Sequence, residues 1–173
     1  MGSPVKRDQT AHERLIPMLV DIVGARVYLE LGTYQGDTIK KVQCPVRIGV
    51  DRDIALSLTF PDRFYKMSTQ EFIQKCAAEC PPFDVVYIDA DHGPTAVLAD
   101  FHGIYPFVAD EGLILMHDGN PQTAADTAPG YCDEAWKAIR EITEEDEHEY
   151  EAVTLPYFPG LTIVRKRVQW GPR

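Results

Sequence analysis

The sequence predicts a doubly wound, Rossmann-like α/β fold, in which a mostly parallel sheet of seven strands ends in an antiparallel hairpin. Strand-like and helix-like segments alternate along most of the chain, which is typical of parallel sheets covered by helices. Several strand-like segments are apolar throughout, as expected for strands buried on both faces. The last two strands are joined by the five residues PYFPG, whereas a parallel crossover needs about a dozen, so they must form a hairpin.

The N-terminal half is expected to hold three strands and the helices between them. Apolar residues recur at helical spacing over residues 8–23, and Pro17 inside this pattern should kink or restart the helix. Apolar runs at 26–31 and 46–51 indicate buried strands, and residues 63–67 indicate a weaker one. Further helices are expected at 36–43, in a short stretch up to Pro61, and at 69–79.

The C-terminal half continues the alternation and then adds the hairpin. Its expected elements are strands at 83–89 and 113–117, helices at 94–103 and 133–144, and closing strands at 150–155 and 161–167. The helix at 133–144 is capped by Asp133 and follows a loop at 119–130 that is rich in Pro, Gly, Ala and Thr. No repeat or linker is visible, so residues 1–173 are expected to form one domain, with residues 1–25 as an N-terminal helical segment.

Composition and charge narrow the classes of function. The chain is 45% hydrophobic and 25% charged, as in globular proteins, and its formal charge of −10 argues against binding to nucleic acid or anionic membranes. No apolar run approaches the ~20 residues of a membrane span, and the N-terminus lacks a signal-peptide core. We therefore expect a cytoplasmic protein.

The four cysteines do not form a recognisable metal motif. Cys76 and Cys80 are four residues apart and would share a helix face, but Cys44 and Cys132 are not a second close pair. Reduced, mostly buried thiols are the expectation.

The segment ELGTYQGDT at residues 30–38 is the strongest binding signal. A strand that runs into a turn with Gly32 and Gly36 can bring backbone N–H groups close to a nucleotide-like ligand. The turn lacks the third glycine of the dinucleotide motif, and Glu30 would repel a pyrophosphate. A ligand with an ammonium or sulfonium group would instead be attracted. S-adenosylmethionine has both groups, and it has a carboxylate for the N–H groups of the turn.

Polar residues also follow each of the first five predicted strands. In parallel sheets, ligands bind outside the carboxyl ends of the strands, so these residues are expected to share one cleft. They are Glu30 and Gly32; Asp51; Ser68, Thr69 and Gln70; Asp89, Asp91 and His92; and His117, Asp118 and Asn120.

Taken together, the motifs YLELGTYQGDT, GVD, MSTQE, VVYIDADH and GLILMHD resemble class I S-adenosylmethionine-dependent methyltransferases over essentially the whole chain. Within that superfamily they look like metal-dependent O-methyltransferases of the catechol and macrolide-sugar kinds, and like small bacterial relatives with an IDxDH…HD pattern. The resemblance implies the class I methyltransferase fold and methyl transfer to a small-molecule hydroxyl.

The resemblance also implies which residues bind the cofactor. Asp51 would accept hydrogen bonds from the ribose hydroxyls, and Thr69 and Gln70 would lie beside the adenine, next to Ser68. Asp89 would border both the cofactor and a metal. The methionine part would be held by Glu30, Gly32, Thr33, Tyr34, Gly36 and Thr38.

A metal and a base are implied in the same way. Asp89 matches the first metal-binding carboxylate of those enzymes, and the pair that follows 28 and 29 residues later is here His117 and Asp118. His92, three residues after Asp89, matches their general base, and an ordinary imidazole pKa near ~6.5 would suit that role. A divalent cation would make the acceptor hydroxyl easier to deprotonate.

Alternatives remain for the metal and the base. Two carboxylates and an imidazole suit Mn, Fe or Zn better than Mg, and the transfer could also proceed without metal, with His92 or His117 acting alone. His117 could instead bond a neighbouring carbonyl group, and His92 could be a surface residue at a helix start. Asp91 could replace Asp89 as a ligand or cap the following helix.

Alternatives also remain for the overall function. With about 25 residues before the first strand, the acceptor must be held by the 119–131 loop, by PYFPG or by another subunit, so a homo-oligomer is open. A sensor or partner protein that binds S-adenosylmethionine without transferring its methyl is one rival. A nicotinamide-dependent oxidoreductase is another, weakened by the missing glycine, by Glu30 and by the hairpin.

Overall fold

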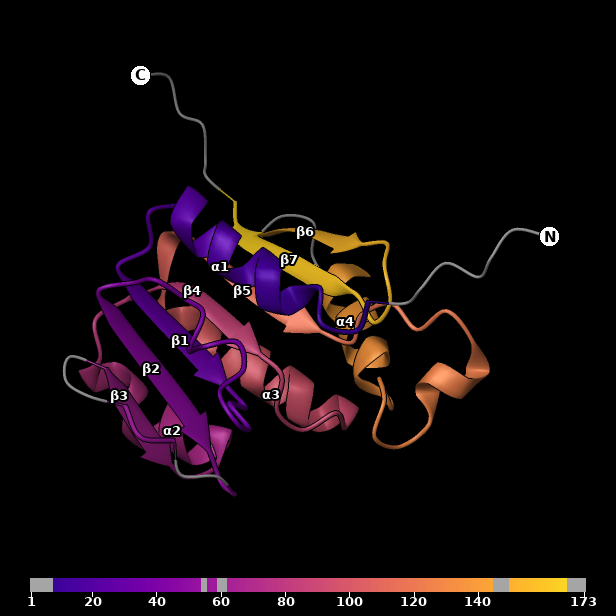
Figure 1. Ribbon diagram of the computed structural model, residues 1–173, viewed down its shortest axis with the longest axis horizontal. Coiled ribbons are helices and arrows are strands. Elements are labelled where there is room, and N and C mark those ends of the chain that lie inside the picture. The colour runs from indigo at the N-terminus through magenta and orange to yellow at the C-terminus, as the bar shows by residue number, and fades with distance from the viewer. Residues whose placement is uncertain (1–7, 54–55, 59–61, 145–149, 168–173) are drawn as a thin grey trace, which may run out of the picture.

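The computed structural model of the protein describes residues 8–53, 56–58, 62–144 and 150–167. Within these ranges, seven strands form a sheet of order β3-β2-β1-β4-β5-β7-β6 (Figure 1). The strands are β1 (Val27–Leu31), β2 (Val46–Asp51), β3 (Arg63–Lys66), β4 (Phe83–Ile88), β5 (Val108–His117), β6 (Tyr150–Leu155) and β7 (Leu161–Lys166).

The pairing of the strands confirms the predicted mixed sheet. Strands β1 to β5 pair in parallel, with Leu31 level with both Val50 and Ile88 near the carboxyl end. Strand β7 is antiparallel to both β5 and β6, so the chain closes with the expected hairpin. Because β1 lies between β2 and β4, the order of the strands reverses at β1, which is where ligands bind in folds of this kind.

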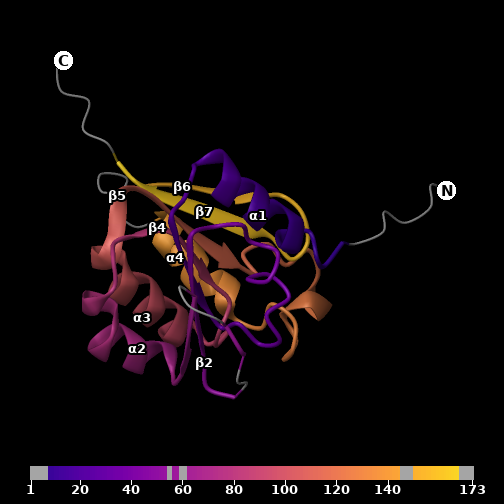
Figure 2. The same cartoon turned by 60° about the vertical axis from the view of Figure 1, so that its left-hand side comes forward.

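Helices cover the sheet on both faces. The α-helices are α1 (His12–Ile22), α2 (Thr69–Lys75), α3 (Pro94–Ile104) and α4 (Ala135–Glu144), and short 3-10 turns lie at Ala77–Glu79, Tyr105–Phe107 and Ala124–Thr127. Figure 2 shows α1 on the opposite side of the sheet from α2 and α3. None of the described helices is long and apolar enough to cross a membrane.

Alternation along the strands divides the core into two clusters. Leu29 and Leu31 of β1 point toward the cluster that includes Phe72 of α2 and Phe101 of α3. Tyr28 alternates with these residues along β1, so its side chain points to the opposite face and belongs to the second cluster, which includes residues of α1. Glu30 follows two residues after Tyr28, so its side chain leaves the sheet on the same side as Tyr28.

Two expected helices differ from the structure. Residues 37–41 form turns, and only Lys40 N–H reaches back four residues, to the Gly36 carbonyl. The segment is short and carries β-branched residues, so its helical propensity is too weak to compensate for nucleation, and it is held instead by burial of Ile39 and Val42. Of the expected helix up to Pro61, residues 52–53 and 56–58 are not helical and the rest lies outside the described residues.

Smaller differences concern Pro17 and the ends of α2 and β5. Pro17 lies inside α1, which continues through it as one helix. Helix α2 ends at Lys75 and is followed by a 3-10 turn where a longer helix was expected. Strand β5 begins five residues earlier than predicted, at Val108, with a register shift against β4.

Gly32 is required where β1 meets the end of β4. Its φ is +87°, and a Cβ there would lie 2.1 Å from the carbonyl oxygen of Asp89. The neighbouring backbone is fixed, because Gly32 N–H donates to the Val50 carbonyl and Asp89 N–H to the Leu31 carbonyl, both at 2.9 Å. The missing side chain thus permits close packing of two strand ends, whereas the sequence suggested room for a ligand or a positive φ.

Gly32→Ala should therefore prevent folding or destabilise the protein by more than about 3 kcal/mol, because it adds a backbone clash to the strain of a positive φ. Gly24→Ala is the matched control: its φ is +64° and nothing lies within 4 Å of a Cβ there. Gly24→Ala should cost only about 1–2 kcal/mol. Urea denaturation of both variants measures the difference, and equal costs would contradict the packing role of Gly32.

Candidate functional site

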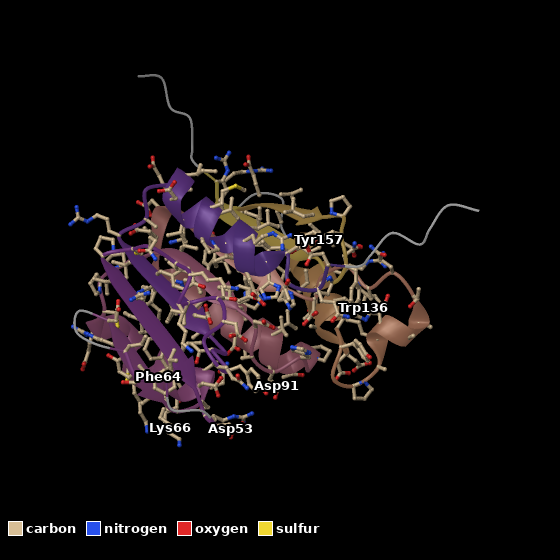
Figure 3. The ribbon with its side chains drawn as sticks, viewed as in Figure 1. Asp53, Phe64, Lys66, Asp91, Trp136 and Tyr157 are labelled. Carbon is tan, nitrogen blue, oxygen red and sulfur yellow. The ribbon has the colours of Figure 1, made fainter. Side chains whose placement is uncertain are left out.

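A cavity of about 330 Å³ opens at the carboxyl ends of the parallel strands. Gly32 and Tyr34 line it from the end of β1, Asp51 from the end of β2, and Asp89 from the end of β4. Ser68, Thr69 and Gln70 line it from the start of α2. Asp53 and Asp91, which also line it, lie toward the lower edge of the molecule in Figure 3. The structure thus brings seven of the expected cofactor residues together.

Asp51 at the end of β2 helps to hold the turn that contains Gly32 and Gly36. Its Oδ2 accepts a hydrogen bond from the Tyr34 backbone N–H at 2.8 Å, and its Oδ1 accepts one from the Asp53 N–H at 2.9 Å. Tyr34 has a φ of +43°, a conformation that costs free energy for a residue with a side chain. The hydrogen bond that its N–H donates to Asp51 helps to hold it there. Each carboxylate oxygen of Asp51 keeps a further lone pair for a ligand.

The other four expected cofactor residues do not line this cavity. Glu30, Thr33 and Thr38 are buried, at 2%, 3% and 5% exposure. Gly36 has a φ of +78°, and a Cβ there would meet Leu56 and Lys40. These residues shape the turn, and sequence reasoning could not separate them from residues that face a ligand.

Glu30 is an unusual carboxyl group. The Tyr28 hydroxyl donates a hydrogen bond to its Oε2 at 2.6 Å. Burial raises the pKa of Glu30 from an ordinary 4.5 to about 8, and the hydrogen bond from Tyr28 only partly opposes this. Glu30 is therefore mainly protonated at neutral pH. The negative charge on which its expected attraction for an ammonium or sulfonium group depended is mostly absent.

A second group of side chains lies beside the cavity, at the ends of β4 and β5. His92 Nε2 is 3.6 Å from Asp89 Oδ1 and 3.3 Å from Asp118 Oδ2. His117 Nδ1 is 3.4 Å from the same Asp89 oxygen and 3.2 Å from the same Asp118 oxygen. We call these four residues the acid–imidazole cluster. Asp89 belongs both to this cluster and to the cavity.

Neighbouring groups fix the orientation of the cluster. His92 Nδ1 is 2.9 Å from the Tyr131 carbonyl oxygen, so this nitrogen must donate and Nε2 must face the carboxylates. The Tyr87 hydroxyl donates to Asp89 Oδ2 at 2.8 Å, which leaves Oδ1 for the imidazoles. Asp118 has a φ of +64°, a strained conformation, and its Oδ2 lies 3.2–3.3 Å from both imidazoles.

The cluster shifts the pKa values of its own members. Attraction to Asp89 raises the pKa of His92 to about 9, against a smaller opposing effect of burial. Burial lowers the pKa of His117, but the carboxylates of Asp89 and Asp118 outweigh this and raise it to about 10. Burial would likewise raise the pKa of Asp89, but the two imidazoles hold it well below its usual value. The expectation of an ordinary imidazole pKa at His92 is therefore wrong for these surroundings.

The donor atoms of the cluster fit a small divalent cation. Ligands about 2.1 Å from one metal ion lie about 3.0–3.4 Å apart, depending on geometry. The acid-to-imidazole distances of 3.2–3.6 Å are close to this range. In the described ranges, Asp89, His92 and Asp118 each offer a ligand atom within 4.8 Å of the others. His117 is not part of this group, although its Nδ1 faces the same two carboxylate oxygens. Two of the three expected metal residues therefore form the group together with the expected base, His92.

Two of the expected polar residues have local structural contacts. Asp91 Oδ1 accepts a hydrogen bond from the Gly93 N–H at 2.8 Å, at the start of α3, and Asp91 stands outside the group of metal-ligand candidates in the described chain. Asn120 donates from its side chain to the Tyr157 carbonyl at 2.9 Å, which ties the 119–131 loop to the β6–β7 turn. Both contacts explain these residues without a ligand.

Sequence reasoning missed two residues beside the acid–imidazole cluster. The ring of His12, on α1, lies 4.2 Å from that of His117, centroid to centroid. Cys132 is fully buried near Asp118, and burial together with that carboxylate raises the pKa of its thiol to about 12. All four cysteines carry free thiols, as expected, but only Cys132 is buried and the other three are half-buried, so the expectation of mostly buried thiols is wrong. Nothing in the sequence pattern marks His12 or Cys132, because both come to the site from elements distant in the chain.

The chain is similar to known proteins in part of its sequence and in its structure. Residues 53–119 match a family model described as a methyltransferase domain. No curated protein is similar enough in sequence to match. Solved structures match over nearly the whole chain. The O-methyltransferase from Bacillus cereus in complex with SAH covers 95% of this chain and 84% of its own, at 15% identity and a TM-score of 0.69. The chain has the class I methyltransferase fold.

Two further structures share this class I fold. The O-methyltransferase TomG from Streptomyces achromogenes, in complex with SAM, covers 95% of this chain and 83% of its own, at 14% identity and a TM-score of 0.67. The MycE methyltransferase of the mycinamycin pathway, in complex with Mg and SAH, has 14% identity and a TM-score of 0.61. The match covers 93% of this chain but only 55% of MycE.

The raised pKa of Glu30 gives a testable pH dependence. The folded state holds the Glu30 proton up to about pH 8, whereas an ordinary carboxyl releases it near 4.5. Between these values the folded state binds more protons, so stability should fall as pH rises, by up to about 1.4 kcal/mol per pH unit. Glu30→Gln should remove this part of the decline, because a neutral amide cannot ionise.

Thermal denaturation between pH 5.5 and 8 measures the effect. The melting temperature of Glu30→Gln should fall less over this interval than that of the parent protein. Glu141→Gln, at an exposed position on α4, is the control for loss of one carboxyl group. The same pH dependence in the Glu30→Gln variant and in the parent would show that Glu30 ionises normally.

Proposed function

We propose that this protein is an S-adenosylmethionine-dependent methyltransferase that methylates a hydroxyl group of a small molecule. The observation that carries the proposal is the position of Asp89, which lines the 330 Å³ cavity and also belongs to the acid–imidazole cluster. A donor bound in the cavity would therefore end beside groups that can hold a metal and accept a proton. The match of residues 53–119 to a methyltransferase domain supports this reading.

The cavity residues are proposed to bind the methyl donor. S-adenosylmethionine would supply an electrophilic methyl group. The lone pairs left on Asp51 would accept hydrogen bonds from the ribose hydroxyls, and Ser68, Thr69 and Gln70 would contact the adenine. Gly32 and Tyr34 would face the methionine part. Glu30, Thr33, Gly36 and Thr38 would act indirectly, by holding the turn in shape.

The cluster is proposed to bind a divalent cation and to handle the proton. Asp89, His117 and Asp118 would hold the ion, and their imidazole nitrogen favours Mn, Fe or Zn over Mg. When bound, the cation would stabilise negative charge on the acceptor oxygen. In the absence of a cation, the two carboxylates raise the pKa of His92 and keep it protonated. A bound cation would balance their negative charge. His92 Nε2 could then accept the proton of the hydroxyl group, with its ring fixed by the Tyr131 carbonyl.

A direct test is formation of S-adenosylhomocysteine from S-adenosylmethionine with a panel of small hydroxyl compounds. Turnover should rise when Mn²⁺ or Zn²⁺ is added to metal-free protein. Full turnover in chelator would instead support methyl transfer without metal. Binding of S-adenosylhomocysteine without any turnover across the panel would support a sensor or partner role. The cytoplasmic location and a homo-oligomeric state stay predictions.

Asp51→Asn should weaken S-adenosylhomocysteine binding by about tenfold, because the amide loses one charged acceptor shared by the turn and the ribose. Isothermal titration calorimetry gives the dissociation constants. Asp21→Asn, at an exposed position on α1, should leave the dissociation constant unchanged. An equal constant for Asp51→Asn and the parent would remove Asp51 from the ribose role.

Asp118→Asn should abolish the metal-dependent rate and leave S-adenosylhomocysteine affinity nearly intact, because Asp118 belongs to the cluster and does not line the cavity. Turnover with and without Mn²⁺, together with calorimetry of S-adenosylhomocysteine, separates the two effects. Loss of cofactor binding in this variant would show that Asp118 has been assigned to the wrong function.

A further inference from the structure

A buried aspartate lies next to a residue that lines the cavity. Asp100 lies on α3, is 1% exposed, and belongs to the buried face of that helix with Val97, Phe101 and Ile104. Ala96, one helical turn earlier on α3, lines the cavity. An aspartate is rarely buried to this extent unless hydrogen bonds compensate for the loss of water. The partners of Asp100 therefore indicate its purpose.

Asp100 takes a hydrogen bond from the first turn of α2. Gln70 Nε2 donates to Asp100 Oδ1 at 2.6 Å. Burial raises the pKa of Asp100, and its Oδ2 has no hydrogen-bond partner among the described residues. A proton held on Oδ2 leaves Oδ1 able to accept the bond from Gln70. Gln70 lines the cavity, so Asp100 bonds to a cavity residue from outside the cavity.

This hydrogen bond determines which end of the Gln70 amide is free to contact a ligand. A side-chain amide has a donating and an accepting end, and its two orientations differ only in which end points where. With the NH₂ group of Gln70 on Asp100, its Oε1 is left to accept. Gln70 therefore presents an acceptor, and this part of the cavity can recognise a hydrogen-bond donor.

We propose that Asp100 is a positioning residue that makes the cavity select a 6-aminopurine nucleoside over a 6-oxopurine nucleoside. It acts by fixing the amide of Gln70 so that Oε1 accepts a hydrogen bond from the exocyclic amine of the base. A 6-oxopurine places a carbonyl oxygen where the amine would be, and two acceptors then face each other. This inference rests on the proposed S-adenosylmethionine site, because it assigns the base end of that ligand.

The experiment compares two ligands that differ at position 6 of the purine. Isothermal titration calorimetry would give dissociation constants for S-adenosylhomocysteine and for S-inosylhomocysteine. The parent protein should bind the adenosyl compound at least about tenfold more tightly, the cost of one unpaired polar contact. In Asp100→Asn, the new amide can offer either end to Gln70. Gln70 can then turn, and the ratio of the two constants should fall toward one.

A double variant tests orientation separately from shape. In Asp100→Asn combined with Gln70→Glu, the amide and the carboxylate exchange places. Asn at position 100 can donate to Glu at position 70, whose other oxygen can only accept. The preference for the adenosyl compound should therefore return. Because this pair keeps the volume and the hydrogen bond of the parent, it remains informative where the single variant folds poorly.

A matched control uses an acid with hydrogen bonds elsewhere. Asp62 accepts hydrogen bonds from the side chain of Arg47, at the amino-terminal end of β2. Asp62→Asn should leave the ratio at the parent value. A variant of Asp100 that weakens both ligands equally would show that Asp100 only supports the fold, and this would overturn the proposal.

The outcomes for the parent protein separate this inference from the proposed function. If the parent binds S-adenosylhomocysteine but does not discriminate against the inosyl compound, the role of Asp100 is wrong and the methyltransferase proposal stands. If the parent binds neither compound, the proposed function itself fails. Discrimination by the parent that is lost in Asp100→Asn and restored in the exchanged pair would establish the role.

Discussion

Asp89 N–H donates to the Leu31 carbonyl at 2.9 Å, and the Asp89 backbone fills the space where a side chain at Gly32 would stand. This close junction of β1 and β4 sets the position of Asp89. The side chain of Asp89 then lies between the cavity at the ends of β1 and β2 and the imidazoles at the ends of β4 and β5. A wider separation of the two strands would move the carboxylate away from one of these sites.

Buried polar groups around this junction are arranged in pairs. On β1, the Tyr28 hydroxyl donates to Glu30. On the neighbouring β4, the Tyr87 hydroxyl donates to Asp89, which directly follows the strand. Each pair is two residues apart, so both partners lie on the face that α1 covers. The consequences differ because the surroundings differ. Among the described residues no cation offsets the burial of Glu30, so it tends to keep its proton, whereas Asp89 faces two imidazoles and stays ionised.

Much of the fold and of the cluster could be predicted from local signals. The strands at 46–51 and 150–155 were predicted with the observed ends, because their apolar patterns are clear and turns bound them. Asp89, His117 and Asp118 were predicted to meet because parallel strands bring their carboxyl ends to one edge. The helix expected at 36–43 was wrong, because its local propensity is weak and burial of Ile39 decided its shape.

The sequence by itself determined the order of the strands along the chain, the closing hairpin, and the set of polar residues at the strand ends. These depend on spacing along the chain, which a sequence records directly. Only the tertiary structure decided that Glu30 is buried and largely uncharged, that His92 and His117 share two carboxylates, and that Asp100 of α3 bonds to Gln70 of α2. These properties depend on which groups from distant segments replace water around a side chain, and that replacement sets both its pKa and its hydrogen bonds.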